Sequence, residues 1–397
     1  MAKLVVIKEP EGDRSPFLRG ILVQSLVNAG LGFNDAYTLA QQVRNDLQDR
    51  QEITSTELKE KVAGLLAVKH TAEHRKQYEV MPPRTEPGIV VHTPTRSMPF
   101  SVGILAHSLE TCAIPPEIAM QGARNVLASL RKTGHREIDH KTLRRVIYRC
   151  LREHCSIHSA ERYLSWRRFE NSGIPMVILI GGATGSGKST ISSELAFRLD
   201  ITRHQSTDMM REIIRSYLSP QMVPTLEYSS FEAWRGLPAS VEGARQDEGH
   251  PVVAGFLSQL AAMKLAMQAT IERAIDERHH LILEGVHVAP TEMDLDVKPD
   301  KAVVIPVMLA TMKKDLLCKQ LQRRGRENVM HQASRYKEGI EDIWELQSWL
   351  LDEADKAGIT IIENWHIEET VRTAMDLVIG ELMKHFPPQS EEGVWET

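Results

Sequence analysis

Residues 182–189 match the pattern G-x-x-x-x-G-K-[ST], and no other segment constrains the fold of this 397-residue chain as strongly. An apolar segment, 176–180, precedes these residues, and an amphipathic segment follows them. A strand before the pattern and a helix after it form the context in which its glycines turn backbone N–H groups toward phosphate. The predicted phosphate-binding loop consists of Gly182, Ala183, Thr184, Gly185, Ser186, Gly187, Lys188, Ser189 and Thr190.

The sequence of this loop predicts that ATP is the phosphoryl donor. We expect Lys188 to reach the β- and γ-phosphates of ATP, and Ser189 to ligate Mg²⁺. A glycine-rich turn that binds nothing is the alternative interpretation, and the flanking strand and helix disfavour it. The pattern does not separate a kinase from a GTPase, a motor or an ATPase subunit, so that choice depends on the residues that follow.

From residue 174 onward, short apolar runs alternate with amphipathic segments. The longest expected helix is 255–278, and the expected strands are 176–180, 203–207, 281–285, 302–309 and 359–364. This alternation predicts an α/β fold with a doubly wound parallel sheet of about five strands, as in small P-loop kinases. We expect the kinase-like domain to span 174–385 and a polar tail, 386–397, to follow it.

The first half of the chain contains an internal repeat. The segments PFLRGILVQSL, from Pro16, and PFSVGILAHSL, from Pro99, match with a shift of 83 positions. Each copy is expected to contain an extended apolar segment, two amphipathic helices, and a third helix after a turn at Ile53 or Ile138. We therefore expect two helical modules, 1–80 and 89–168, joined by the proline-rich linker 81–88.

Polar residues after the second expected strand favour a kinase. Asp208 follows this strand, and Arg211 and Arg215 lie at i and i+4 on one face of the next helix. The Asp208 carboxylate is suited to orient an acceptor hydroxyl or to accept its proton, and paired guanidinium groups bind a carboxylate or phosphate. The alternative is that both arginines form ion pairs with Glu212 or other acids.

Glu284 lies near the end of the third expected strand, at the edge where open α/β sheets bind ligands. It is a candidate to hold Mg²⁺ through water or to act as the base, so Asp208 and Glu284 compete for the base role. His287 is a candidate to orient a substrate oxygen, and a structural hydrogen bond is the alternative.

A basic cluster, Arg323, Arg324 and Arg326, surrounds Gly325 on and just past an expected helix. We interpret it as a lid in which Arg323 and Arg326 stabilise the charge on the transferring phosphoryl group, with Gly325 as a hinge. The alternative is a basic helix end that interacts only with the helix dipole.

The segments 206–208 (STD), 229–234 (SSFEAW), 281–287 (LILEGVH) and 361–364 (IIEN) resemble the 2-phosphoglycerate kinases, and the likeness extends over 174–385. This resemblance implies ATP-dependent conversion of 2-phosphoglycerate to 2,3-bisphosphoglycerate. The arginine pair would then bind the anionic groups of the acceptor. The acceptor pocket would draw on 229–234 and 255–259, with Ser229, Ser230, Trp234 and Gly255 as its candidate residues.

The repeat is similar to the ATP-cone, a small regulatory nucleotide-binding module. Val6-Ile7-Lys8 and Gly12 resemble its entry motif, which implies that Lys8 contributes to a regulatory nucleotide site. In the second copy His92 stands in the place of Lys8 and the glycine is missing. The second module is therefore expected to be a degenerate, structural copy.

Acidic residues (53) slightly outnumber Lys plus Arg (48), so no global positive field favours nucleic acid or an anionic membrane. The N-terminus lacks a signal-peptide core and no run approaches the ~20 apolar residues of a membrane span, so we expect a cytoplasmic protein. The expected partner is a small phosphorylated acceptor, and the N-terminal modules are the candidate surface for a homo-oligomer. A kinase of another sugar or polyol phosphate, or a nucleotide-sensing protein without acceptor chemistry, remains an alternative.

Overall fold

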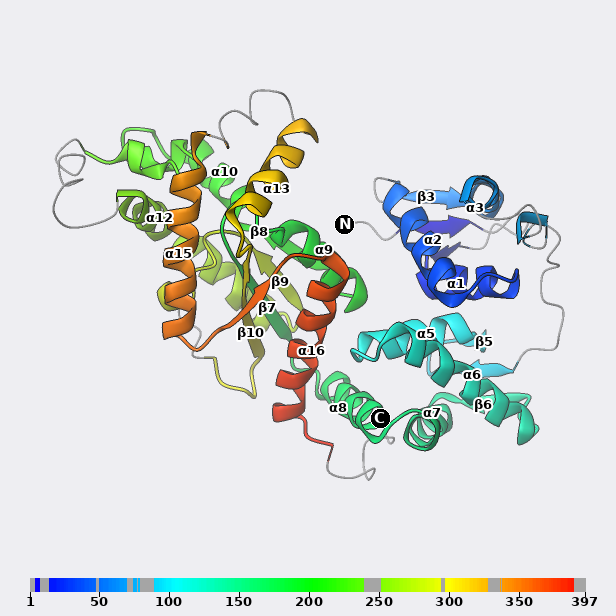
Figure 1. The fold of residues 1–397 in the computed structure, drawn as a ribbon. Helices are drawn as coiled ribbons and strands as arrows, with labels where there is room; N and C mark the ends of the chain where they lie inside the picture. Colours follow the sequence, from blue (N-terminus) through cyan, green and yellow to red (C-terminus); the bar gives the residue numbers. More distant parts are fainter. Residues whose placement is uncertain are drawn as a thin grey trace. The chain divides into compact units, whose positions relative to one another are not determined.

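The computed structural model describes residues 4–7, 14–47, 50–69, 74–76, 78, 89–238, 251–293, 297–327, 336 and 338–388. The chain divides into two compact units (Figure 1). Unit 1 takes in 1–171 and 386–397, and unit 2 takes in Ser172–His385. Each unit has its own sheets and core, so each is described by itself.

Unit 1 contains both copies of the repeat, and each copy combines a three-stranded sheet with helices. The first copy comprises β1 (Val5–Ile7), β2 (Arg14–Pro16), α1 (Arg19–Asn28), α2 (Phe33–Asp46), β3 (Glu52–Thr54) and α3 (Ser55–Lys69). The second copy comprises β4 (Val90–His92), β5 (Ser97–Pro99), α5 (Val102–Thr111), α6 (Pro116–Lys132), β6 (Glu137–Asp139) and α7 (His140–His154), and α8 (Ile157–Ser172) follows it.

The two copies have the same strand topology. In each, the first strand pairs antiparallel with the second strand and parallel with the third. Ile53 and Ile138 lie in the middle of the third strands, so the expectation of turns at these residues is wrong. Strands of three residues are too short to show the alternation by which a strand is recognised in a sequence.

The third helix of each copy begins at an equivalent position and is capped by a side chain. Thr54 and Glu57 form a capping box at α3, where each accepts a hydrogen bond from the backbone N–H of the other at 3.1 Å. Asp139 caps α7, where its Oδ1 accepts from the Thr142 N–H at 2.9 Å. These caps define where the third helix starts in both copies.

The two copies meet where α1 and α5 cross. Gly20 and Gly103, which are equivalent in the repeat, face each other, and a Cβ on either residue would collide with the backbone of the other helix. Beside this crossing Arg19 is fully buried. Its guanidinium donates to Glu110 at 2.5 Å and lies 4.3 Å from the centre of the Tyr37 ring.

We expect Glu110→Ala to lower the free energy of unfolding by about 3–5 kcal/mol, because it removes the carboxylate that pairs with the buried Arg19 charge. The double variant Arg19→Met/Glu110→Leu removes both charges and is expected to lose less stability than the single variant. Urea unfolding of the full chain, followed by circular dichroism, measures both. A single variant more stable than the double variant would contradict this role of the ion pair.

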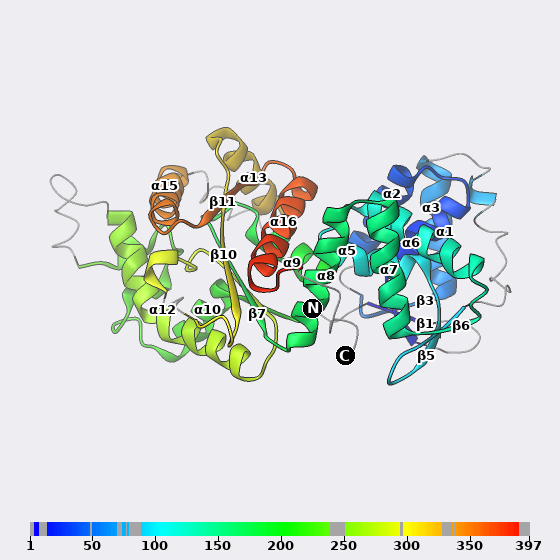
Figure 2. The same ribbon diagram turned by 90° about the horizontal axis from the view of Figure 1, so that it is seen from below.

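Unit 2 contains one five-stranded parallel sheet in the order β11-β10-β7-β9-β8, of which Figure 2 labels β11, β10 and β7. This confirms the predicted α/β fold. The strands and helices are β7 (Met176–Gly181), α9 (Lys188–Arg198), β8 (Arg203–Ser206), α10 (Thr207–Tyr217), α12 (Pro251–Asp276), β9 (Leu281–Glu284), β10 (Val303–Ala310), α13 (Lys314–Glu327), α15 (Ile340–Lys356), β11 (Thr360–Glu363) and α16 (Ile367–His385). In the described part of unit 2, short 3-10 helices are η1 (Pro224–Glu227), η2 (Ala233–Gly236) and η4 (Pro290–Glu292).

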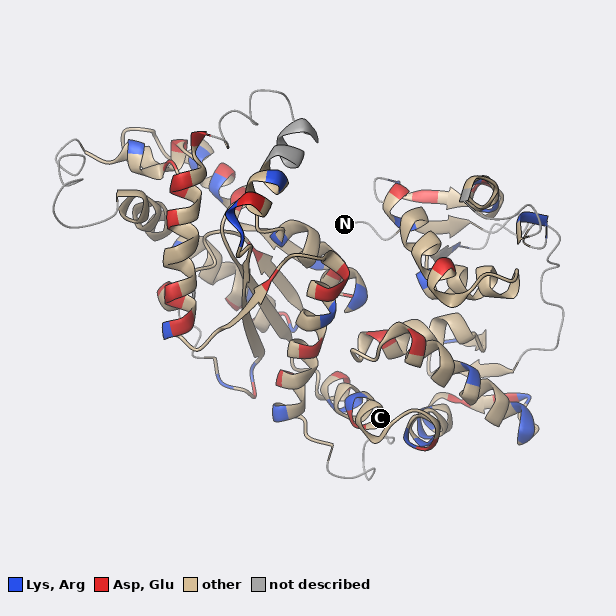
Figure 3. Ribbon diagram, in the orientation of Figure 1, with Lys and Arg blue, Asp and Glu red and all other residues tan. Residues whose placement is uncertain are grey.

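Helices cover both faces of this sheet. α9 and α16 pack on one face, and α12 and α15 pack on the other (Figures 1 and 2). All six residues of β7 and all four of β9 are buried, which explains why these strands are apolar rather than alternating. Acidic and basic residues are interspersed over the helices of both units (Figure 3).

Among the described helices, α12 is long and apolar enough to cross a membrane by length and composition. This helix corresponds to the expected long helix, 255–278, and it passes this test although no run of about 20 apolar residues was expected. Phe256, Leu260, Met263 and Met267 of this helix are buried in the core formed with the sheet. This packing accounts for the apolar residues on the inner side of α12.

The carboxyl ends of β7, β9 and β8 lie side by side, because the three strands are parallel neighbours. β7 leads into the phosphate-binding loop, β8 leads into α10, and β9 ends at Glu284. In the register of the sheet, Glu284 pairs with Ile180 of β7 and with Ser206 of β8. The polar residues predicted from the sequence therefore meet at one sheet edge, where open α/β sheets bind ligands.

Candidate active site

The phosphate-binding loop turns from β7 into α9 through Gly187, which adopts a left-handed conformation (φ 85°) at the N-cap of the helix. A Cβ at this position would collide with the side chain of Asn364, the residue after β11. Asn364 Nδ2 donates to Ser186 O at 2.8 Å, and Thr370 Oγ1 donates to Asn364 Oδ1 at 3.0 Å. The end of β11 thus holds the loop in its turn.

Two polar groups of the loop fit a phosphate ligand. Lys188 Nζ donates to Ala183 O at 2.8 Å, which places its ammonium group over the loop. Ser186 is buried, and its Oγ has no hydrogen-bond partner among the described residues. A buried polar group without a partner costs about 1–3 kcal/mol, and a phosphate oxygen would satisfy it.

Ser189 and Glu284 fit a magnesium ion beside the phosphates. Ser189 Oγ donates to Glu284 Oε1 at 3.0 Å, and Glu284 is only 4% exposed. Mg²⁺ prefers oxygen ligands and takes few of them from the protein, the rest being phosphate oxygens and water. Within the described part of the chain, no group of three or more His, Cys, Asp or Glu side chains is placed to hold a metal.

Asp208 and Glu284, the two candidate bases, lie in different environments. Asp208 lies in the first turn of α10, where its side chain is exposed and makes no hydrogen bond or ion pair with the residues that the structure describes. Glu284 is buried and bonded to Ser189. The carboxylate of Asp208 is therefore open to solvent, whereas the carboxylate of Glu284 is occupied by the Ser189 hydroxyl.

The two arginines of α10 contact acids and backbone in this structure. Arg211 donates to carbonyls of the turn 226–228 at 2.8 and 3.0 Å, and to Glu212 at 2.6 Å. Arg215 donates to Glu212 at 2.7 Å and to Glu227 at 3.3 Å. These are ion pairs of the kind that the sequence offered as the alternative. An anionic acceptor that binds both guanidinium groups must displace Glu212.

His287 is buried between α10 and α12. Its Nδ1 lies 3.2 Å from Thr207 Oγ1, and its Nε2 lies 2.8 Å from Gln259 Oε1. The ring stacks on that of Phe256, with 5.7 Å between the centroids. Both ring nitrogens are therefore engaged within the protein.

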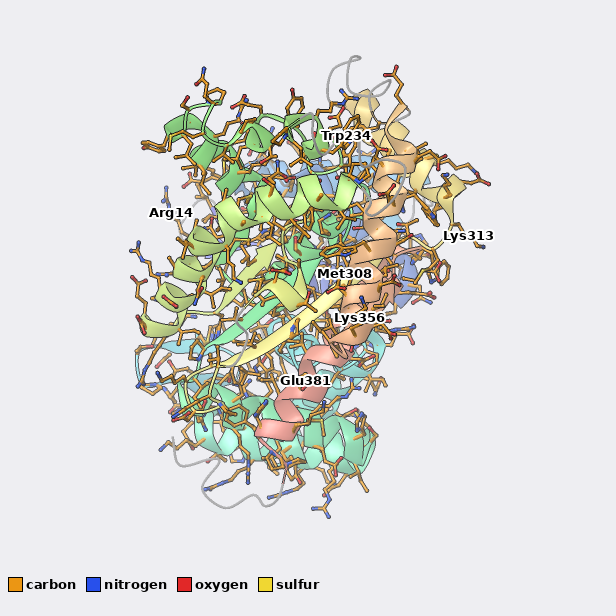
Figure 4. The ribbon with its side chains drawn as sticks, turned by 90° about the vertical axis from the view of Figure 1, so that its left-hand side faces the viewer. Arg14, Trp234, Met308, Lys313, Lys356 and Glu381 are labelled. Atoms are coloured by element: carbon orange, nitrogen blue, oxygen red, sulfur yellow. The ribbon has the colours of Figure 1, made fainter. Side chains whose placement is uncertain are left out.

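The residues that the family resemblance implies for the acceptor pocket lie around η2. Ser230 is buried, Ser229 is partly buried, and Trp234 Nε1 donates to Asp342 at 3.1 Å. Figure 4 shows Trp234 near one end of α15. Gly255 packs so closely that a Cβ would collide with the backbone of Trp234. These residues form a packed group that joins η2 to α12 and α15.

Two predicted regions fall wholly or partly outside the described residues. Lys8 belongs to 8–13, which the structure does not describe, so its regulatory role stays a prediction. Arg323 and Arg326 lie on α13, but their side chains are outside the description. α13 continues through Gly325, so the expected helix end at a glycine hinge is wrong. A single glycine costs a helix about 1 kcal/mol, which a helix of this length tolerates.

An open pocket that the sequence did not reveal lies between the start of α13 and the residue that follows Asn364. It has a volume of about 530 Å³ and is lined by Lys313, Lys314, Asp315, Leu316, Lys319 and Trp365. Trp365 follows Asn364, which is bonded to the loop, and its indole is 60% exposed. The signal in the sequence was an aromatic residue directly after the IIEN segment.

A parallel sheet with a phosphate-binding loop after its central strand and acids at the neighbouring strand ends defines a P-loop nucleotide-binding fold. No family model matches the chain. The 2-phosphoglycerate kinase of Pyrococcus horikoshii is 36% identical over 291 residues, which cover 72% of this chain and 93% of that protein. The enzymes named 2-phosphoglycerate kinase from Pyrococcus furiosus and Methanocaldococcus jannaschii are each 34% identical, over 72% and 78% of this chain and 92% and 97% of those proteins.

The chain belongs to the 2-phosphoglycerate kinase family. The resemblance stated from the sequence is therefore confirmed, and the protein is a kinase whose phosphoryl donor is ATP. The relatives do not favour a sugar or polyol phosphate kinase, or a nucleotide sensor without acceptor chemistry.

Burial lowers the pKa of His287 to about 4, while the carboxylate of Asp208 opposes the shift and the charges of Arg211 and Lys188 add to it. The ring is neutral at pH 7, and unfolding at low pH takes up a proton there. We therefore expect stability to fall by up to about 3 kcal/mol as the pH drops from about 6.5 to about 4.

His287→Gln isolates this contribution, because glutamine keeps a neutral hydrogen-bonding side chain that does not titrate. Urea unfolding at a series of pH values measures the slope of stability against pH for both proteins. We expect a shallower acid slope in the variant. The same slope in both proteins would show that His287 is not kept neutral by the fold.

Proposed function

We propose that the protein transfers the γ-phosphoryl group of ATP to the free hydroxyl of 2-phosphoglycerate, forming 2,3-bisphosphoglycerate and ADP. The observation that carries this proposal is the unpaired carboxylate of Asp208 at the same sheet edge as the phosphate-binding loop. The names of the relatives supply the acceptor.

On the donor side, the phosphate-binding loop and Lys188 neutralise the β- and γ-phosphates. Ser189 would ligate Mg²⁺ directly and Glu284 would hold it through water, as their 3.0 Å contact supports. Bound there, the metal ion would neutralise charge on the phosphate oxygens. Arg323 and Arg326 of α13 are proposed to add positive charge over the transferring group.

On the acceptor side, the Asp208 carboxylate orients the acceptor hydroxyl and takes its proton as the new O–P bond forms and the bond to ADP breaks. Arg211 and Arg215 bind the carboxylate and phosphate of the acceptor after Glu212 gives way. His287 would help to hold the start of α10, and with it Asp208, through its hydrogen bond with Thr207.

The proposed activity is tested by incubating the pure protein with Mg-ATP and a panel of phosphorylated acids, sugar phosphates and polyol phosphates. Mass spectrometry then detects a product with one added phosphoryl group. We expect a product from 2-phosphoglycerate and little from the other compounds. Turnover of another acceptor in its place would show that the proposed acceptor is wrong.

We expect Asp208→Asn to lower kcat by about 100-fold or more, because a positioned base contributes about 10²–10⁴-fold. The affinity for ATP should hardly change in this variant. Glu284→Gln should instead raise the Mg²⁺ concentration needed for half-maximal rate. Steady-state kinetics in a Mg²⁺ titration separates the two effects. Full activity of Asp208→Asn would transfer the base role to Glu284.

We further propose that Trp365 stacks on the base of ATP, because its exposed indole lines an open pocket and follows Asn364, which is bonded to the phosphate-binding loop. Stacking of one base on an aromatic ring contributes about 1–3 kcal/mol, so Trp365→Ala should raise KM for ATP about 5- to 100-fold. Trp365→Phe should retain most of the affinity. An unchanged KM for ATP in the alanine variant would exclude Trp365 from the nucleotide site.

A further inference from the structure

Gln259 is a fully buried polar residue on α12 whose one amide group contacts two other segments of unit 2. Its Nε2 donates to the carbonyls of Thr225 and Tyr228 at 2.8 and 3.0 Å. Its Oε1 lies 2.8 Å from His287 Nε2. The amide thus ties the η1 turn and the segment after β9 to the same point of α12.

These contacts determine the position of the proton on the His287 ring. Both amide hydrogens of Gln259 are donated to carbonyls, so its Oε1 accepts a hydrogen bond from His287 Nε2–H. Because the ring is neutral, Nδ1 is an acceptor, and Thr207 Oγ1 donates to it. Hydrogen bonds therefore run in one direction, from Thr207 through His287 to Gln259.

The η1 turn is also held from the side of α10. The Tyr228 carbonyl accepts from Gln259 and from Arg211 Nη1, both at 3.0 Å. Arg211 lies one helical turn after Asp208 on α10. Gln259 is consequently linked to two residues of α10. His287 connects it to Thr207 at the start of the helix, and the Tyr228 carbonyl connects it to Arg211.

We propose that Gln259 is a positioning residue for the acceptor side, holding Asp208 and Arg211 in the geometry that receives the phosphorylated acceptor. This inference rests on the proposed function. Loss of the amide releases Thr207 and the η1 turn together, whereas the phosphate-binding loop is held separately by Asn364. Acceptor binding and nucleotide binding are therefore expected to respond differently.

Gln259→Leu tests this difference by steady-state kinetics. We expect KM for 2-phosphoglycerate to rise about 10-fold or more, and KM for ATP to stay within about twofold, because a displaced positioning group affects the reactant that it orients. Gln268→Leu is the matched control, since it makes the same change on α12 at a residue bonded to Glu272 outside this network. Equal rises in both KM values, or no rise in either, would overturn the proposal.

Gln259→Glu is expected to change the pH dependence of kcat/KM for the acceptor, which a merely structural role of Gln259 would leave unchanged. A carboxylate beside Nε2 raises the pKa of His287 from about 4 toward neutrality. The other charges that act on this pKa, those of Asp208, Arg211 and Lys188, are unchanged in the variant. A protonated ring donates a hydrogen bond from Nδ1 where it formerly accepted one. kcat/KM for the acceptor should then fall more steeply than in the wild type as the pH drops below neutrality.

The double variant Gln259→Glu/His287→Gln lacks the titrating ring and should lose this acid limb. A pH profile of Gln259→Glu identical in shape to that of the wild type would overturn the proposal. So would an acid limb steeper than that of the wild type that persists in the double variant, because it would arise from another group.

The tautomer of His287 tests the network independently of the acceptor. In ¹⁵N-histidine NMR spectra, with the signal assigned by its loss in His287→Gln, we expect the Nε2–H tautomer. An Nδ1–H tautomer would overturn the role of Gln259 even where 2-phosphoglycerate is phosphorylated. If the Nε2–H tautomer is found but another compound is the acceptor, only the proposed acceptor is wrong. The role of Gln259 is then tested by comparing the KM for that compound with the KM for ATP in Gln259→Leu.

Discussion

The hydrogen bond from Asn364 to the carbonyl of Ser186 is the contact on which the donor half of the site depends. It joins the end of β11 to a loop that follows β7, two strands away in the sheet. Because a side chain at Gly187 would collide with the same amide, the loop and the end of β11 each require the other. The contact also holds the residue before Trp365, so one amide joins the loop to the strand end from which Trp365 lines its pocket.

The acceptor half is organised by a second buried amide, that of Gln259, and the two halves share little beyond the sheet edge itself. Asn364 acts from the β11 side of the sheet and Gln259 acts from α12 near β9. Independent supports allow one half to tolerate change while the other keeps its geometry. This arrangement suits a kinase, whose donor chemistry is common to many enzymes and whose acceptor is not.

Sequence patterns predicted those parts of unit 2 in which local chemistry decides structure. The phosphate-binding loop needs particular residues at fixed spacing, and buried parallel strands such as β7 need long apolar runs. The cavity at Trp365 and the network at Gln259 were not predictable, because each joins residues that are far apart in the chain. The three-residue strands of unit 1 were not predicted for another reason, since they are too short to show a sequence pattern.

The repeat also shows how the two copies of a duplicated module come to pack against each other. The match to the Pyrococcus horikoshii enzyme covers 93% of that protein but 72% of this chain, so the chain has length that this relative lacks. Duplication supplies the same glycine to α1 and α5, and two equivalent helices can then cross closely. The positions equivalent to Arg19 and Glu110 in the other copy are Val102 and Val27. The contact between the copies is therefore asymmetric, because a buried ion pair occupies positions that carry valine in the other copy.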